Sequence, residues 1–200
     1  MTFGEALREQ RWDDHRFYHQ SRINQSLHFF SAISFLVSYV TLFNSPGMAA
    51  IIGWMAAMCS RQAGHFFFEP KTYDEINDTT HQYKEDVKVG YNLKRKVVLM
   101  GLWLLSPFAL YHYPTFLGLF EAHTTTAEYF EHLGLLWLYL GIAALIFRTV
   151  HLFFIRDVQT GLVWFTKILT DPFHDIKIYH KAPIYLMKGE MYDPMTHSRF

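Results

Sequence analysis

The sequence predicts an all-α membrane protein with about four transmembrane helices, and three observations lead to this prediction. Half of the 200 residues are hydrophobic and only 18% are charged, against about 25% in an average soluble domain. The apolar residues gather in long blocks with almost no charge, and the basic residues gather in alternate segments between them. The formal net charge is zero, so the chain lacks the basic excess typical of nucleic-acid binding proteins.

Four apolar blocks are the candidate spans. They cover residues 29–43, 46–59, 97–120 and 133–155. A helix needs about 20 mainly apolar residues to cross the hydrocarbon core, and the last two blocks meet that length. The first two are shorter, so we expect them to recruit flanking residues or to form a re-entrant hairpin around the turn at 44–47. Pro107 and Pro114 predict a kink or an end of the third block near Tyr111.

The basic residues predict the orientation of these spans. Seventeen of the 18 Lys and Arg residues lie before residue 28, between 60 and 96, or after 155, and the exception is Arg148. The positive-inside rule then places both termini and the central segment in the cytoplasm. A soluble helical bundle is the alternative, but it would leave this charge alternation as an accident.

The same pattern divides the chain into two parts. We expect a membrane domain over residues 1–155, with 70–96 as a cytoplasmic insertion, and a cytoplasmic or interfacial tail over 156–200. In that tail, residues 162–169 predict a short helix that ends at Asp171-Pro172. The first 20 residues are polar and show no secretory signal, so a bacterial inner membrane and an endoplasmic reticulum are both expected locations.

Twelve histidines accompany a single cysteine, which excludes a disulfide framework and a cysteine-based zinc site. The predicted topology places nine of them on or near the cytoplasmic side: His15, His19, His28, His65, His81, His151, His174, His180 and His197. Three of these, His28, His65 and His151, reach the same depth at the cytoplasmic ends of different spans. Ionisable residues in or at a span are functional candidates, because burying them is costly.

The local spacings add detail to this group. His65 and Glu69 stand at i and i+4, which predicts either two ligands of one metal or a ligand and its hydrogen-bonded partner. Gly64 leaves room for another backbone to approach. Arg148 lies three residues before His151, on roughly the same helix face, and a buried arginine binds a carboxylate well, either Glu69 or the acid group of a substrate. Imidazoles and carboxylates without thiolates suit iron or zinc.

Two motifs resemble a known family. They are Tyr18-His19-Gln-Ser-Arg-Ile-Asn24-Gln-Ser-Leu-His28-Phe29 and Gly64-His65-Phe-Phe-Phe-Glu69. Over residues 18–69 the chain resembles the 2-hydroxy fatty acid dioxygenases of the fungal endoplasmic reticulum and their bacterial relatives. The resemblance implies a small multi-span protein that uses Fe(II) and O2 to shorten a long-chain 2-hydroxy acid by one carbon. The charged insertion and the tail lie outside the matching region.

The resemblance also implies roles for the matching residues. His19, His28 and His65 are expected to ligate Fe(II), and Glu69 is expected to be a fourth ligand or to orient His65. His151 is a further candidate metal ligand, and Asn24 and Arg148 are the expected substrate-binding residues. The expected partners are the lipid bilayer and a long-chain lipid or 2-hydroxy fatty acid. Two alternatives stay open: a di-iron fatty acid hydroxylase or desaturase with many clustered histidines, and a lipid-binding membrane protein without enzymatic activity.

Overall fold

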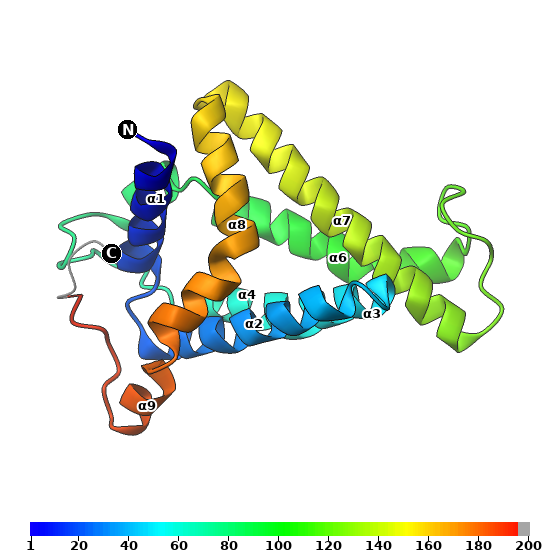
Figure 1. Cartoon of the computed structure of the whole chain (residues 1–200), viewed down its shortest axis with the longest axis horizontal. Helices are drawn as coiled ribbons and strands as arrows, with labels where there is room; N and C mark the ends of the chain where they lie inside the picture. Colours follow the sequence, from blue (N-terminus) through cyan, green and yellow to red (C-terminus); the bar gives the residue numbers. More distant parts are fainter. Residues whose placement is uncertain (196–200) are drawn as a thin grey trace.

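Helices account for the regular structure of the protein (Figure 1). The structure is a computed structural model, and it describes residues 1–195. In chain order the elements are α1 (Phe3–Tyr18), α2 (Arg22–Thr41), α3 (Pro46–Ile51), the π-helical segment η1 (Ile52–Met58), α4 (Cys59–Phe67), α5 (His81–Val87), α6 (Leu93–His112), α7 (Thr126–Ile155), α8 (Val158–Tyr179) and α9 (Ala182–Met187). The all-α prediction is confirmed for the part of the chain that the structure describes.

The two short apolar blocks belong to longer helices. α2 has 20 residues because it begins at Arg22, well before the apolar block, and residues 46–67 form an unbroken helical run through α3, η1 and α4. Ser45 starts that run, since its hydroxyl accepts a hydrogen bond from the Met48 amide and Pro46 suits the first helical turn. At about 1.5 Å per residue each helix is roughly 30 Å long. Both blocks therefore extend into their flanking residues, and the resulting length is the one that the first of the two expected arrangements needs.

α6 ends where its prolines predicted. The helix stops at His112, next to Tyr111, and the prediction of an end at this point is confirmed. Pro107 lies inside the helix and does not end it. A proline has no amide hydrogen for the carbonyl four residues earlier, which here is Trp103. The Ser106 hydroxyl donates to that carbonyl at 2.7 Å, so the freed acceptor is satisfied.

The predicted end of α8 at Asp171-Pro172 is wrong. α8 continues through Pro172 to Tyr179, and Figure 1 shows the helix bending in its second half. The Tyr39 hydroxyl on α2 donates to the Leu169 carbonyl at 3.1 Å, which supplies a hydrogen bond in the turn that the proline weakens. Packing against α2 therefore carries the helix past a residue that would end it in isolation.

α7 is a 30-residue helix that starts at a capping box made by Thr125 and Glu128. Among the described helices, it is the one long and apolar enough to cross a membrane by length and composition. Only 17% of its most apolar 18-residue window is buried. Its buried part packs on α3, η1 and α6, where the indole of Trp54 donates to the Trp137 carbonyl and the indole of Trp137 donates to Ser106.

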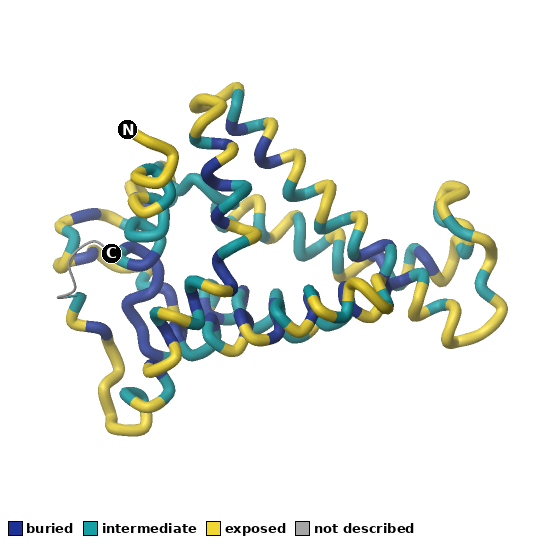
Figure 2. The backbone as a smooth tube through the Cα atoms, in the orientation of Figure 1, coloured by how far each residue is buried: buried dark blue, intermediate teal, exposed yellow. Residues whose placement is uncertain are grey.

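α8 brings the C-terminal part of the chain back onto the first helices. It packs against α2, α7 and α1, and Asp157 caps its start by accepting from the Thr160 amide. Figure 2 shows the buried residues gathered where α1, α2 and α8 meet, at the end of the molecule opposite the loop between α6 and α7. Residues that the sequence placed in a tail therefore form one wall of this buried region.

Candidate metal centre

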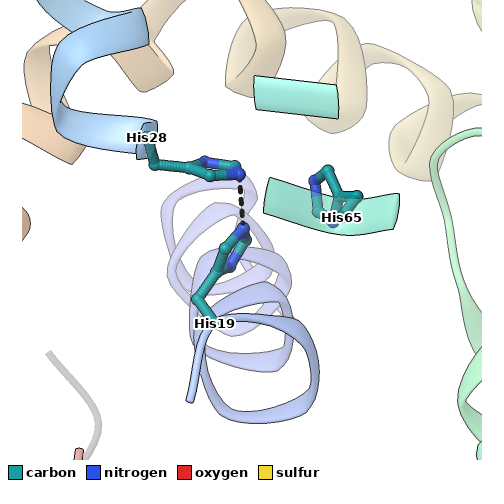
Figure 3. Close-up of side chains that lie close together, drawn as sticks. All are labelled: His19, His28 and His65. Carbon is teal, nitrogen blue, oxygen red and sulfur yellow. Dashed lines mark hydrogen bonds between the residues drawn. The ribbon is translucent and has the colours of Figure 1, made fainter. Parts of the chain in front are cut away.

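Three histidines from three helices converge in this buried region (Figure 3). His19 caps the end of α1, His28 lies in the second turn of α2, and His65 lies near the end of α4. The nitrogen that each offers as a ligand lies within 4.8 Å of the others. The Nε2 atoms of His19 and His28 are 3.1 Å apart, and the His65 ring centre is 5.2 Å from that of His19 and 5.0 Å from that of His28.

Hydrogen bonds fix the tautomers of two of these rings. His19 Nδ1 lies 2.8 Å from the backbone carbonyl oxygen of Asp14, and since a carbonyl only accepts, Nδ1 carries the hydrogen and Nε2 presents its lone pair. His65 Nδ1 lies 2.8 Å from Glu69 Oε2, so the carboxylate orients His65 in the same way. A carboxylate or carbonyl on the outer ring nitrogen is the usual partner of a metal-binding histidine.

The electrostatics keep these rings neutral. Burial, and then the neighbouring His28, lower the pKa of His19 well below its ordinary value. Burial, and then the nearby Lys96, do the same for the pKa of His65. A neutral imidazole is the form that binds a metal. The cluster is therefore in its ligating form at neutral pH.

The third ring, His28, has a buried polar atom without a partner. Its Nδ1 makes no hydrogen bond to any described residue and faces Asp175 Oδ2 at 3.7 Å. A neutral His28 that uses Nε2 as a ligand carries its proton on Nδ1, toward that carboxylate. Adjacent ligands at metal–nitrogen bonds of about 2.1 Å lie about 3.0–3.4 Å apart, which matches the 3.1 Å between His19 and His28. His19 and His28 therefore fit a shared metal ion, and His65, whose ligand nitrogen lies within 4.8 Å of both, is placed to be the third imidazole.

Asn24 acts on the same region through packing. Its side-chain amide donates to the Tyr18 carbonyl at 2.7 Å, next to His19. Its Oδ1 presses against Gly64, where an added Cβ would lie only 2.0 Å from that oxygen. Gly64 was expected to admit another backbone, but it admits the side chain of Asn24. Asn24 thus fixes the distance between α2 and α4, the helices that carry His28 and His65.

Arg148 and His151 are not brought to the cluster. His151 lies outside the group of three, and its Nδ1 is 2.9 Å from the Arg148 guanidinium. Arg148 is fully buried and donates to the carbonyl oxygens of Val89 and Gly90. The sequence predicted that the guanidinium of Arg148 binds Glu69 or a substrate, but its N–H groups donate to these backbone carbonyls instead. Arg148 therefore holds the segment before α6 against α7.

The structure also contains a buried network of charged residues behind the cluster, which the sequence did not predict. Lys167 Nζ lies 2.6 Å from Asp14 and 2.7 Å from Asp171, and Arg61 lies 3.0 Å from Asp175. Burial opposes a charged Lys167, but the two carboxylates outweigh it and raise its pKa. A sequence pattern could have indicated this network. Polar residues recur every four positions along one face of α8, at Lys167, Asp171, Asp175 and Tyr179.

A small hollow opens on the other side of the cluster, beside His65. It is lined by His65, Glu69, Lys71, His81, Glu85, Lys88, Leu93 and Lys96. Most of these residues come from the insertion at 70–96, which the sequence predicted only as a charged loop. Three further histidines of the cytoplasmic set lie outside the cluster. His15 Nδ1 lies 3.1 Å from the Tyr179 hydroxyl, His180 is exposed against the Lys177 carbonyl, and His174 lines a hollow near Arg11. His197 lies outside the described residues.

Comparison with known proteins yields no match to this chain. No family model, curated protein or solved structure matches it.

Proposed function

We propose that the protein is an integral membrane oxygenase that uses Fe(II) and O2 to shorten long-chain 2-hydroxy fatty acids, or a closely related lipid, by one carbon. The observation that carries the proposal is the cluster of His19, His28 and His65, with ring orientations held by Asp14 and Glu69. The motifs that resemble the 2-hydroxy fatty acid dioxygenases contain these same three histidines. Imidazole suits iron and zinc alike, and the resemblance favours iron.

The residues of the chain would supply position and protonation state. His19, His28 and His65 approach from three helices and leave other coordination positions for substrate and O2. An iron ion held by these imidazoles would supply activation of O2 and Lewis acidity toward the polar head of the substrate. Glu69 keeps the proton of His65 on Nδ1. The overall reaction balances when a 2-hydroxy acid and O2 give the acid one carbon shorter, carbon dioxide and water.

The surface of the helices supports a membrane setting. Large apolar side chains are exposed along three helices: Phe30, Ile33, Val37 and Val40 on α2, Val97, Val98, Leu102, Leu105 and Phe108 on α6, and Ile142, Ile146, Phe147, Val150 and Phe154 on α7. Soluble monomers rarely expose apolar patches of such extent, and a soluble core helix would be mostly buried, unlike α7. We propose four crossings with both termini and the histidine cluster on the cytoplasmic side, in a bacterial inner membrane or an endoplasmic reticulum.

The composition of the cluster favours one metal ion per chain over two. Within the described residues, the only group of three or more histidine, cysteine or acidic side chains placed to hold a metal is His19, His28 and His65. A di-iron hydroxylase or desaturase needs many more ligands than this group offers. The number of bound ions therefore separates the proposed enzyme from that alternative.

Metal analysis together with O2 uptake tests the proposal. Protein purified in detergent and loaded with Fe(II) without oxygen should hold one iron per chain and consume O2 with 2-hydroxypalmitate but not with palmitate. The His28→Ala variant should lose both iron and activity. The matched His180→Ala variant should keep both, because His180 is exposed and outside the cluster.

The contrary outcomes point to defined alternatives. Two irons per chain would indicate a di-iron enzyme, and a protein that binds no metal and tolerates His28→Ala would indicate a lipid-binding protein. Iron-loaded protein that consumes no O2 with 2-hydroxy acids of any chain length would contradict the proposal.

A further inference from the structure

The hollow beside His65 carries more positive than negative charge. Three lysines line it, Lys71, Lys88 and Lys96, against two carboxylates, Glu69 and Glu85. The hollow lies where α4, α5 and α6 approach one another, and it reaches one of the three histidines of the cluster. An anion bound in it would lie next to that imidazole.

The carboxylates of the hollow already have partners. Glu69 accepts from His65 and pairs with Lys88 at 3.4 Å. Glu85 pairs with Lys88 at 3.1 Å and accepts from the Leu93 amide at 2.9 Å. Lys88 is therefore held by both acids, and its Nζ also lies over the ring of Tyr18. Both acids favour the charged form of Lys96 at a distance, but neither forms an ion pair with it.

Lys96 is the buried lysine of the hollow that takes no part in these ion pairs. Its ammonium makes no hydrogen bond or ion pair to any described residue, whereas Lys71 is exposed and keeps its hydration. Lys96 precedes the apolar block 97–120, and its surroundings lower its pKa to about 7, first by burial and then by the charge of Lys88. A desolvated ammonium without an ion-pair partner in contact is stabilised when an anion binds beside it.

An apolar surface begins directly after Lys96. Leu99, Met100 and Trp103 continue the helix face of Lys96 and are partly buried, while Val97, Val98, Leu102 and Leu105 form the exposed apolar face on the other side of α6. A cation at the start of a helix and apolar side chains along it match a ligand with an anionic head and a long hydrocarbon tail. The short distance along the chain from the head position to the apolar surface favours a fatty acid over a ligand with a large polar head.

We propose that Lys96 binds the carboxylate of a long-chain acid and thereby positions its head beside His65. This assignment rests on the proposed function, and it replaces Arg148, whose donors are taken by backbone carbonyls. Lys96 is a positioning residue: it holds the carboxylate, and the hydrocarbon tail extends along α6 toward the lipid.

Calorimetric binding of short, soluble ligands tests this role without turnover. The probes are 2-hydroxyoctanoate and its methyl ester, titrated without oxygen into the metal-loaded protein in detergent. Lys96→Gln should weaken binding of the acid about tenfold, the value of one charge-assisted hydrogen bond, and leave binding of the ester unchanged. Lys96→Arg should restore binding of the acid. Lys94→Gln removes an exposed charge two residues away, outside the hollow, and should bind both ligands like the wild type.

Three outcomes would overturn the assignment: equal binding of the acid by Lys96→Gln and wild type, an equal loss of acid and ester, or tighter Lys96-dependent binding of octyl phosphate than of the acid. Iron content measured on each variant shows whether the histidine cluster is intact. Lys96-dependent acid binding without O2 consumption would refute the oxygenase and keep the carboxylate site. O2 consumption by the wild type, together with unchanged acid binding in Lys96→Gln, would support the oxygenase and refute the carboxylate site.

Discussion

At the scale of single residues, the centre depends on which ring nitrogen carries the proton. A backbone carbonyl of α1 sets this for His19, and the carboxylate of Glu69 sets it for His65. A carbonyl cannot be changed by substitution, whereas Glu69 can. Glu69 is thus the residue at which the orienting role can be separated from the ligand role that the sequence left open.

Replacement of Glu69 by Gln should weaken metal binding by about 10- to 100-fold, the usual cost of losing an orienting partner of a ligating histidine. Gln keeps the shape of Glu but removes the charge and can donate to His65 Nδ1, which favours the wrong tautomer. Metal affinity measured by competition with a chelator checks this. Glu85→Gln is the control, because it removes a charge from the same hollow without touching His65. Equal affinities for Glu69→Gln and wild type would contradict the role.

At the scale of helices, the contact between α2 and α4 sets the distance between His28 and His65. Gly64 lets the Asn24 side chain lie against the α4 backbone, and Asn24 is held in place by the Tyr18 carbonyl. This contact explains the function of two motif residues without giving either of them a direct contact with substrate.

A methyl group at position 64 should therefore damage both stability and metal binding. In Gly64→Ala the new Cβ would overlap Asn24 Oδ1, and overpacking of this kind costs about 1–3 kcal/mol. Gly101→Ala is the matched control, because no atom lies within 4 Å of the position its Cβ would take. Thermal unfolding and iron content should fall for Gly64→Ala and not for Gly101→Ala. Unchanged values for both variants would show that Asn24 moves away freely.

α8 supports the centre from behind through its charged face. Lys167 joins Asp14 on α1 to Asp171 on α8, and the Asp14 residue also supplies the carbonyl that orients His19. Replacement of Lys167 by Met removes the lysine partner of Asp14, while Asp171 keeps Arg11 at 3.3 Å and Arg61 at 3.7 Å. The expected cost therefore stays below the about 3–5 kcal/mol of a buried pair that is fully broken. We expect a lower Tm for Lys167→Met at neutral pH. Lys177→Met, on the exposed face of the same helix, should unfold like the wild type, and equal Tm values for the two variants would refute the support role.

At the scale of the whole molecule, the histidine cluster and the loop between α6 and α7 lie at opposite ends (Figure 1). The proposed crossing places a membrane between them. The basic residues of the insertion lie at the cluster end, and the loop between α6 and α7 contains no Lys or Arg. The positive-inside rule is the basis for the proposed cytoplasmic side of the cluster.

Cysteine labelling tests this orientation. In a Cys59→Ser background, Ala122→Cys in the far loop should react with a membrane-impermeant maleimide on intact bacterial spheroplasts. Lys71→Cys, in the insertion, should react only after the membrane is permeabilised. Both positions are exposed, so accessibility within the protein does not limit either reaction. Labelling of both in intact spheroplasts would contradict the proposed topology.

The sequence predicted local features better than long-range ones. The apolar blocks predicted helices, Pro107 and Pro114 predicted a kink or an end near Tyr111, and the i, i+4 spacing predicted the contact between His65 and Glu69. These depend on residues close together in the chain. The path of α8 through Pro172 and the partners of Arg148 depend on contacts with α2 and with the segment before α6, which no local pattern encodes.

The three histidines belong to different helices and stand far apart in the chain, so a metal bound by them closes two loops, residues 19–28 and 28–65. A bound ion would thus act on stability like a cross-link, since the unfolded chain cannot keep the three rings together without losing entropy. Binding to the folded state alone adds about 2.7 kcal/mol when the free metal exceeds its dissociation constant a hundredfold. The Tm should therefore rise with metal concentration and fall on chelation, and His28→Ala should abolish this dependence. Metal supply would then govern how much folded protein accumulates, and not only how active it is.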